Sequence, residues 1–135
     1  MRRAREALTR GLILALAAAV LAAGCRERDP AADVTAAWTI DPGPPSAASE
    51  TIARIMLQDA RQQPVRGAAL RLEAHMSHPG MAPVTASLTE SQDGVYETRM
   101  TFSMAGDWVL VVSGTLADGR RILRQLEVTG VRPAG

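Results

Sequence analysis

The sequence has few aromatic residues and a single cysteine, and each scarcity excludes a class of protein. In 135 residues there are four aromatic side chains, those of Trp38, Tyr96, Phe102 and Trp108. A stacking surface for single-stranded nucleic acid or for sugars needs more of them. The lone cysteine, Cys25, cannot form an internal disulfide bond, so a disulfide framework is excluded. Packing alone must stabilise the one domain that this length allows.

Positive charge is also missing where a nucleic-acid partner would need it. All 15 basic residues are arginine, and from position 25 onward 11 arginines stand against 13 acidic residues, a balance of −2. Nucleic-acid binding depends on clustered positive charge, so we expect no nucleic acid as a partner. The sequence contains no G-x-S-x-G, H-E-x-x-H or glycine-rich phosphate motif. We therefore predict that the protein is not an enzyme.

The N-terminus has the layout of a secretory signal. Four arginines in the first ten positions precede 13 uncharged residues, 11–23, which is fewer than the roughly 20 that span a bilayer. The run ends in Leu21-Ala22-Ala23-Gly24-Cys25, which resembles a bacterial lipobox, although its leucine lies one position further from the cysteine than usual. We predict a cleaved lipoprotein signal peptide at residues 1–24 and a lipid anchor on Cys25. An uncleaved anchor is the alternative.

The lipobox resemblance also carries an expectation about location. Arg26 follows the cysteine where aspartate would retain a lipoprotein at the inner membrane. The resemblance therefore implies the bacterial cell envelope, on the periplasmic side, with the outer membrane favoured. Residues 25–33 are polar and small, so they predict a flexible tether ahead of a domain at residues 34–131.

From residue 34 onward, short runs rich in Val, Ile, Leu and Thr alternate with turns that contain Pro, Gly and Asp. This pattern predicts strands at residues 34–40, 50–58, 69–76, 83–90, 95–102, 107–116 and 121–129. Seven short strands favour an all-β fold, an immunoglobulin-like antiparallel β-sandwich, here without the Cys-Trp-Cys core of antibody domains. The alanines at residues 46–52 leave a short helix there as an alternative.

Alternation within the strands assigns side chains to the two faces. It places Leu70, Leu72, Ala74 and Met76 in the core and His75 toward solvent. Residues 108–112 are apolar on both faces, which predicts a central strand.

One segment, His75-Met76-Ser77-His78-Pro79-Gly80-Met81, holds both histidines and two of the six methionines. Imidazole and thioether groups bind copper outside the cytoplasm, where sulfur favours Cu(I) and nitrogen suits Cu(II). If consecutive strands alternate in direction, the connections at residues 41–49, 77–82 and 103–106 share the end remote from the tether. We therefore predict a copper site from His75, His78, Met81 and Met104, with Met76 as a further candidate. The alternative is structural, with Met76 filling the core and the histidines as surface polar groups.

The order of motifs resembles the YtkA-like and FixH-like domains of bacterial envelope proteins. The motifs are Trp38, Gln63-Pro64-Val65-Arg66-Gly67-Ala68, Asp93-Gly94-Val95-Tyr96 and Met104-Ala105-Gly106-Asp107-Trp108, with the His/Met segment between the second and the third. One departure is glutamine at positions 62 and 63, where a turn glycine is common. The resemblance implies a non-enzymatic accessory or chaperone domain that handles copper, with assembly of haem-copper respiratory oxidases as its setting.

Two functions from different classes follow. The first is a lipid-anchored accessory protein that binds copper and passes it to an envelope protein or an oxidase assembly factor. The second is a protein-interaction module of the envelope that binds no metal and uses its methionines as adaptable apolar contacts.

Overall fold

A computed structural model describes residues 28–78 and 80–135 of the chain. The predicted signal peptide and the predicted lipidation at Cys25 lie outside these residues. Within the described part of the chain, no helix is long and apolar enough to cross a membrane.

The described chain is all-β, and its strands agree with the predicted ones to within two residues at each end. They are β1 (Thr35–Asp41), β2 (Glu50–Gln58), β3 (Ala69–Met76), β4 (Val84–Gln92), β5 (Val95–Thr101), β6 (Gly106–Thr115) and β7 (Arg121–Val131). The alternative helix at residues 46–52 does not form, because Glu50, Thr51 and Ile52 already pair with β5.

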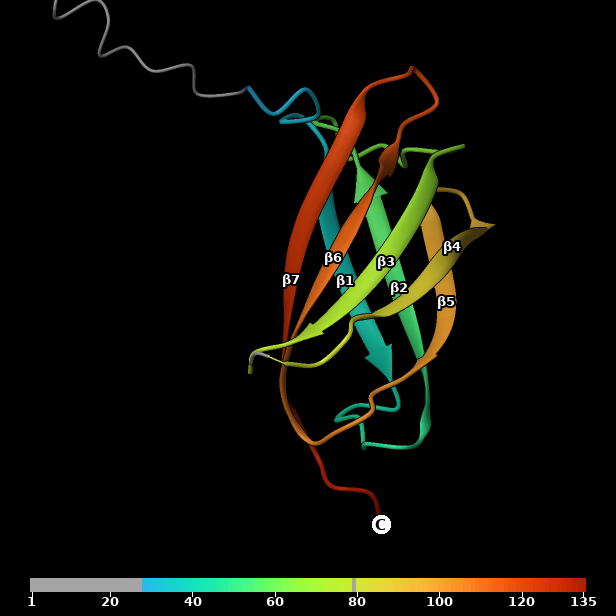
Figure 1. Ribbon diagram of the computed structural model, residues 1–135. Coiled ribbons are helices and arrows are strands. Elements are labelled where there is room, and N and C mark those ends of the chain that lie inside the picture. The colour runs from blue at the N-terminus through green and yellow to red at the C-terminus, as the bar shows by residue number, and fades with distance from the viewer. Residues whose placement is uncertain (1–27, 79) are drawn as a thin grey trace, which may run out of the picture.

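Hydrogen bonds link the strands in the order β1-β2-β5-β4-β3-β6-β7, and every neighbouring pair is antiparallel. β4 changes partner along its length: residues 84–88 pair with β3, whereas residues 89–92 pair with β5. This change folds the sheet over, so that β1, β2 and β5 form one layer and β3, β6 and β7 the other (Figure 1). The order is that of an immunoglobulin constant domain, which confirms the predicted fold class.

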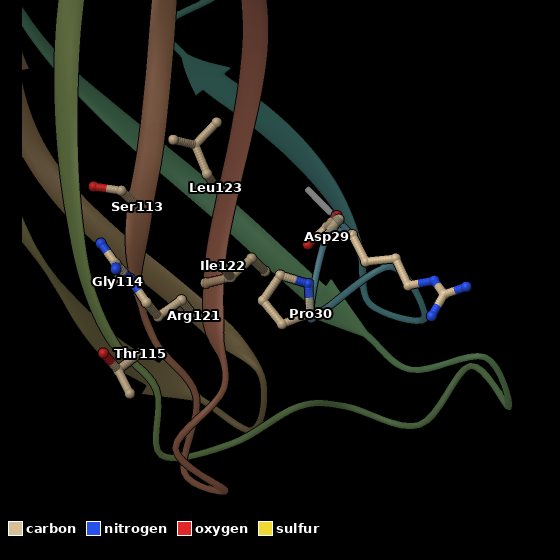
Figure 2. A pocket seen from close by; sticks show the side chains of 9 residues that line it. Asp29, Pro30, Ser113, Gly114, Thr115, Arg121, Ile122 and Leu123 are labelled. Atoms are coloured by element: carbon tan, nitrogen blue, oxygen red, sulfur yellow. The ribbon is translucent and has the colours of Figure 1, made fainter. Parts of the chain in front are cut away.

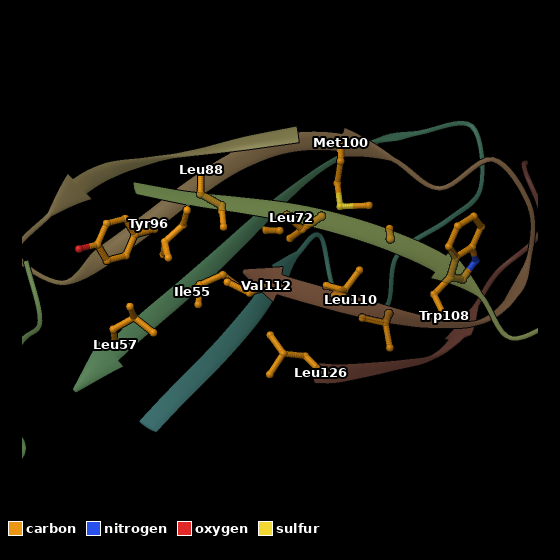
Figure 3. Packing of buried hydrophobic residues seen from close by; sticks show 14 of the residues in the cluster. Ile55, Leu57, Leu72, Leu88, Tyr96, Met100, Trp108, Leu110, Val112 and Leu126 are labelled. Atoms are coloured by element: carbon orange, nitrogen blue, oxygen red, sulfur yellow. The ribbon is translucent and has the colours of Figure 1, made fainter. Parts of the chain in front are cut away.

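The two layers enclose one apolar core (Figure 3). Its largest fully buried apolar side chains are Trp108, Tyr96, Phe102, Ile55, Leu57, Leu72 and Leu110. The rings of Trp108 and Phe102 meet edge to face with their centroids 5.3 Å apart, an arrangement that aromatic pairs favour. On the predicted inward face of β3, Leu70, Leu72 and Ala74 are buried and Met76 is partly buried. As predicted, β6 is central, between β3 and β7.

The structure corrects the predicted tether in its last residues. Residues 29–34 form a turn that packs on the domain, and Ala31 is fully buried, with 0% of its surface exposed. Arg124 of β7 holds this turn: its guanidinium donates to the carbonyls of Ala31 and Val34 and pairs with Asp29 at 2.9 Å. The domain therefore includes the chain from Asp29 onward.

Arg120 provides a second attachment for the same turn. It forms ion pairs with Asp33 and with Asp118. Hydrogen bonds from Arg120 lower the pKa of both carboxyl groups. At Asp33 the main cause is the bond from the Arg120 side chain, and at Asp118 it is the bond from the Arg120 backbone N–H, followed by the side-chain bond. The pair with Asp33 joins residues 87 positions apart, so no local pattern predicts it.

Candidate metal centre

The strand directions gather the loops at two ends of the sandwich (Figure 1). One end, which we call the C-terminal end because β7 finishes there, carries the loops at residues 42–49, 77–83 and 102–105. The N-terminal end carries the turn at residues 29–34 and the connections at residues 59–68, 93–94 and 116–120. The candidate ligands therefore all lie at or beside the C-terminal end, and the chain enters the domain at the other.

His75 and Met76 end β3 with their side chains on opposite faces. Met76 faces inward and packs against the core, and its terminal methyl group would lie 3.3 Å from a Cβ added to Gly106. His75 faces outward and is partly exposed, with its Nε2 atom 3.3 Å from Oε2 of Glu73. The structure thus separates Met76 from His75 and brings Glu73 to the imidazole.

Glu73 is a site residue that the sequence analysis missed. The strand pattern could have indicated it, because Glu73 and His75 are two positions apart on β3 and such side chains share one face. Its carboxylate also lies 3.5 Å from Nε of Arg71, so it contacts both neighbours on that face. Glu73 can therefore fix the orientation of the His75 ring.

His78 and Met81 lie on the loop at residues 77–83, which we call the ligand loop. Both are exposed, and Met81 shows 46% of its surface. The backbone N–H of Ser77 donates to the carbonyl of Asp107 at 3.0 Å and ties the start of the loop to β6. Among the later described residues, 78 and 80–83, the structure shows no further hydrogen bond or ion pair. The donor groups of this loop are therefore open to solvent.

Met104 belongs to the neighbouring loop and is 47% exposed. Its carbonyl accepts a hydrogen bond from the indole Nε1 of Trp108 at 3.1 Å, which fixes the backbone beside the core. Gly106 follows with a φ of 126°, a conformation that favours glycine. The Met-Ala-Gly-Asp-Trp motif thus runs from a bend into β6, with its methionine exposed in the bend and its tryptophan buried in the strand.

The donor set at this end is mixed nitrogen and sulfur. In residues 28–78 and 80–135, no three His, Cys, Asp or Glu side chains come together as metal ligands would. Two imidazoles and two exposed thioethers suit a soft metal ion such as Cu(I). The structure brings their loops to one end of the molecule, and the hydrogen bond from Ser77 to Asp107 joins the ligand loop to the start of β6, directly after the loop that carries Met104.

At the N-terminal end, the loop at residues 59–68, which we call the anchored loop, is fixed by Tyr96. The Tyr96 hydroxyl donates to the carbonyl of Val65 at 2.8 Å and accepts from the N–H of Ala68 at 3.0 Å. Burial raises the pKa of this phenol. Two of the motifs noted in the sequence, at residues 63–68 and 93–96, are therefore in direct contact.

Glu90 makes a second set of bonds in the same place. Its carboxylate accepts from the backbone N–H groups of Gly94 and Gly67, each at 2.9 Å. These two bonds lower the pKa of Glu90, and the bond from Gly94 has the larger effect. Gly94 has a φ of 71°, and a Cβ there would lie 2.7 Å from Cβ of Pro64, so only glycine fits against that proline.

The strand order defines an immunoglobulin-like domain, and the His/Met segment lies at the end of its third strand and in the loop before its fourth. The profile of the family described as YtkA-like matches residues 29–113, more than half of the chain. The protein belongs to the YtkA-like family.

Two solved structures resemble the fold. The soluble domain of PmoD from Methylocystis sp. ATCC 49242 (Rockwell) is 14% identical, with 70% of this chain and 89% of that chain covered and a TM-score of 0.48. An engineered protein is also 14% identical over 75% of this chain, with a TM-score of 0.48, and the chain spans 20% of its length. No curated protein matches the sequence.

Proposed function

We propose that the protein is a lipid-anchored accessory protein of the bacterial cell envelope that binds copper at its C-terminal end and passes it to a partner. The observation that carries this proposal is the exposure of two thioethers, those of Met81 and Met104 at 46% and 47%, at the end that also holds both histidines. The YtkA-like family, as an envelope family associated with copper, supports the same function.

The proposed ligands are His75, His78, Met81 and Met104, and Glu73 positions His75. A carboxylate that accepts from one ring nitrogen of a histidine fixes the tautomer and leaves the other nitrogen to bind a metal ion. Bound copper would supply reversible ligand exchange, which needs an open coordination shell. The exposed ligand loop offers such a shell, because the described residues beyond Ser77 make no bonds that would have to break.

The partner that we propose is a copper-accepting envelope protein or a respiratory oxidase assembly factor, as the FixH-like resemblance implies. Ligand exchange between two proteins requires that both donor sets reach one ion. The C-terminal end satisfies this requirement on the proposed anchoring, because the chain enters the domain at the opposite end (Figure 1).

Titration of the chain with Cu(I) in competition with a chelating indicator tests the proposal. We expect the triple variant His75→Ala, His78→Ala, Met81→Ala to lose at least tenfold in affinity. The matched control is Met56→Leu, which alters a 41% exposed methionine on β2 away from this end. Equal affinity of the wild type and the triple variant would contradict the site.

The same exposed methionines support one alternative, a protein-interaction module without metal. Flexible thioethers suit adaptable contact surfaces. A co-purifying partner whose binding survives a copper chelator, but is lost in Met81→Asp, would favour this function over the first.

A further inference from the structure

A groove of about 700 Å³ opens at the N-terminal end, between residues 28–30 and the outer side of β6 and β7 (Figure 2). Its apolar part includes Pro30 and Leu123, and Leu123 is 57% exposed. Its charged part includes Arg28, Asp29 and Arg121. The groove thus combines exposed aliphatic surface with two guanidinium groups.

The charges in this groove are not balanced. The carboxylate of Asp29 is already paired with Arg124 at 2.9 Å. Neither Arg28 nor Arg121 forms an ion pair with any residue that the structure describes. Figure 2 shows the side chain of Arg121 extending from β7 toward Gly114 of β6. The groove therefore suits an anionic group, because planar guanidinium binds phosphate oxygens well.

The length of chain before the groove limits what can occupy it. Only Arg26 and Glu27 separate Cys25 from Arg28, and three residue steps span about 10 Å at most. If Cys25 carries acyl chains, as proposed above, the groove lies within that distance of the bilayer surface. This is also about one Debye length in physiological salt, so arginine at this distance attracts anionic lipid.

We propose that this groove is a contact site for the phosphate headgroups of anionic phospholipids in the membrane that anchors the protein. Arg28 and Arg121 bind the phosphate, and Leu123 contacts the boundary of the acyl layer. The inference rests on the proposed lipidation of Cys25 but not on copper binding.

This contact also has a consequence for the copper site. β7 has 11 residues and spans roughly 35 Å from one end of the sandwich to the other. Membrane contact at the N-terminal end would hold the ligand loop at about that distance from the bilayer. There it faces the periplasmic space and the proteins within it.

The test uses the lipidated chain in vesicles with a nitroxide label at an introduced cysteine. Acylation blocks the natural cysteine, so Leu123→Cys or Ser103→Cys supplies the only free thiol. In vesicles with 30% phosphatidylglycerol, we expect the label at position 123 to be at least fivefold less accessible to a water-soluble relaxation agent than the label at position 103. In pure phosphatidylcholine, we expect the two labels to be equally accessible.

A charge reversal identifies the occupant. Arg121→Glu in the Leu123→Cys background should abolish the protection, because each arginine contributes about fivefold to partition onto an anionic surface. The matched control is Arg61→Glu, the same charge change at the same end but outside the groove. Protection that persists in Arg121→Glu would show that something other than the headgroup, such as the preceding chain, fills the groove.

Each remaining outcome is decisive. Equal accessibility of the labels at positions 123 and 103 in anionic vesicles overturns the contact. A chain whose intact mass shows no acyl groups contradicts the anchoring itself, on which the contact depends. Cu(I) affinity of the same samples is measured separately, so a loss of membrane contact can be distinguished from a loss of copper binding.

Discussion

The two loops that flank β3 are built in opposite ways. The anchored loop at residues 59–68 is bonded by the side chains of Tyr96, Glu90 and its own Asp59. In the ligand loop at residues 77–83, the described residues make one bond, at Ser77. Side-chain hydrogen bonds therefore fix the loop at the N-terminal end, whereas His78, Met81 and Met104 at the other end are exposed to solvent.

The largest effect should come from Gly94, where the anchored loop is closest to its support. Gly94→Ala introduces a Cβ 2.7 Å from Pro64 at a φ of 71°, so we expect a loss of about 2–4 kcal/mol in the free energy of unfolding. Denaturant unfolding followed by tryptophan fluorescence measures it.

Gly119 provides the matched control for this change. It has a φ of 88° and nothing within 4 Å of an added Cβ, so Gly119→Ala carries the backbone strain without the clash and should cost about 1 kcal/mol. Equal losses for the two variants would mean that contact with Pro64 is unimportant.

The next effect concerns the buried phenol. Tyr96→Phe keeps the ring but leaves the carbonyl of Val65 and the N–H of Ala68 without their partner. We expect a loss of about 1–3 kcal/mol and faster amide hydrogen exchange within the anchored loop. Unchanged exchange at residues 65–68 would show that other contacts fix this loop.

Glu90 adds a pH dependence to the anchored loop. Because its pKa is lowered by bonds from Gly94 and Gly67, its ionised form stabilises the fold above the usual pKa of glutamate, and this contribution is lost as pH falls through the lowered value. Glu90→Gln should therefore be less stable than the wild type at pH 7, with a smaller gap at pH 3. A gap that stays constant from pH 7 to pH 3 would contradict this role.

The smallest effect on stability should come from the ligand loop. His78→Ala with Met81→Ala removes two exposed side chains, so the free energy of unfolding should change by no more than about 0.5 kcal/mol. Chemical denaturation without metal tests this. A loss above 1 kcal/mol would mean that the loop is packed, and the contrast with the anchored loop would fail.

The strands could be predicted because alternation and turn residues are local signals. Alternation correctly predicted that Leu72 is buried and that His75 faces outward. The alternating directions of the strands correctly predicted that Met104 lies at the same end as His78. These positions follow from chain direction alone, so neither contacts nor packing had to be known.

Other features depend on residues far apart in the sequence and had no such signal. The docking of residues 29–34 depends on Arg120, in the turn before β7, and on Arg124 of β7. The change of partner in β4 coincides with the end of its alternation: residues 84–88 alternate between apolar and polar, whereas residues 89–92 are all polar and exposed. Loss of alternation does not by itself say which strand a segment pairs with. The contact between Glu73 and His75 lay within reach of the strand pattern, but whether the two side chains meet depends on their rotamers.

X-ray absorption at the copper edge tests the central claim most directly, because it distinguishes sulfur from nitrogen around the ion. The Cu(I) complex of the wild type should show both a nitrogen and a sulfur shell, and the variant Met81→Leu, Met104→Leu should lose the sulfur shell while Met56→Leu keeps it. A wild-type spectrum without sulfur, or one that the double variant leaves unchanged, would contradict copper binding by the exposed methionines.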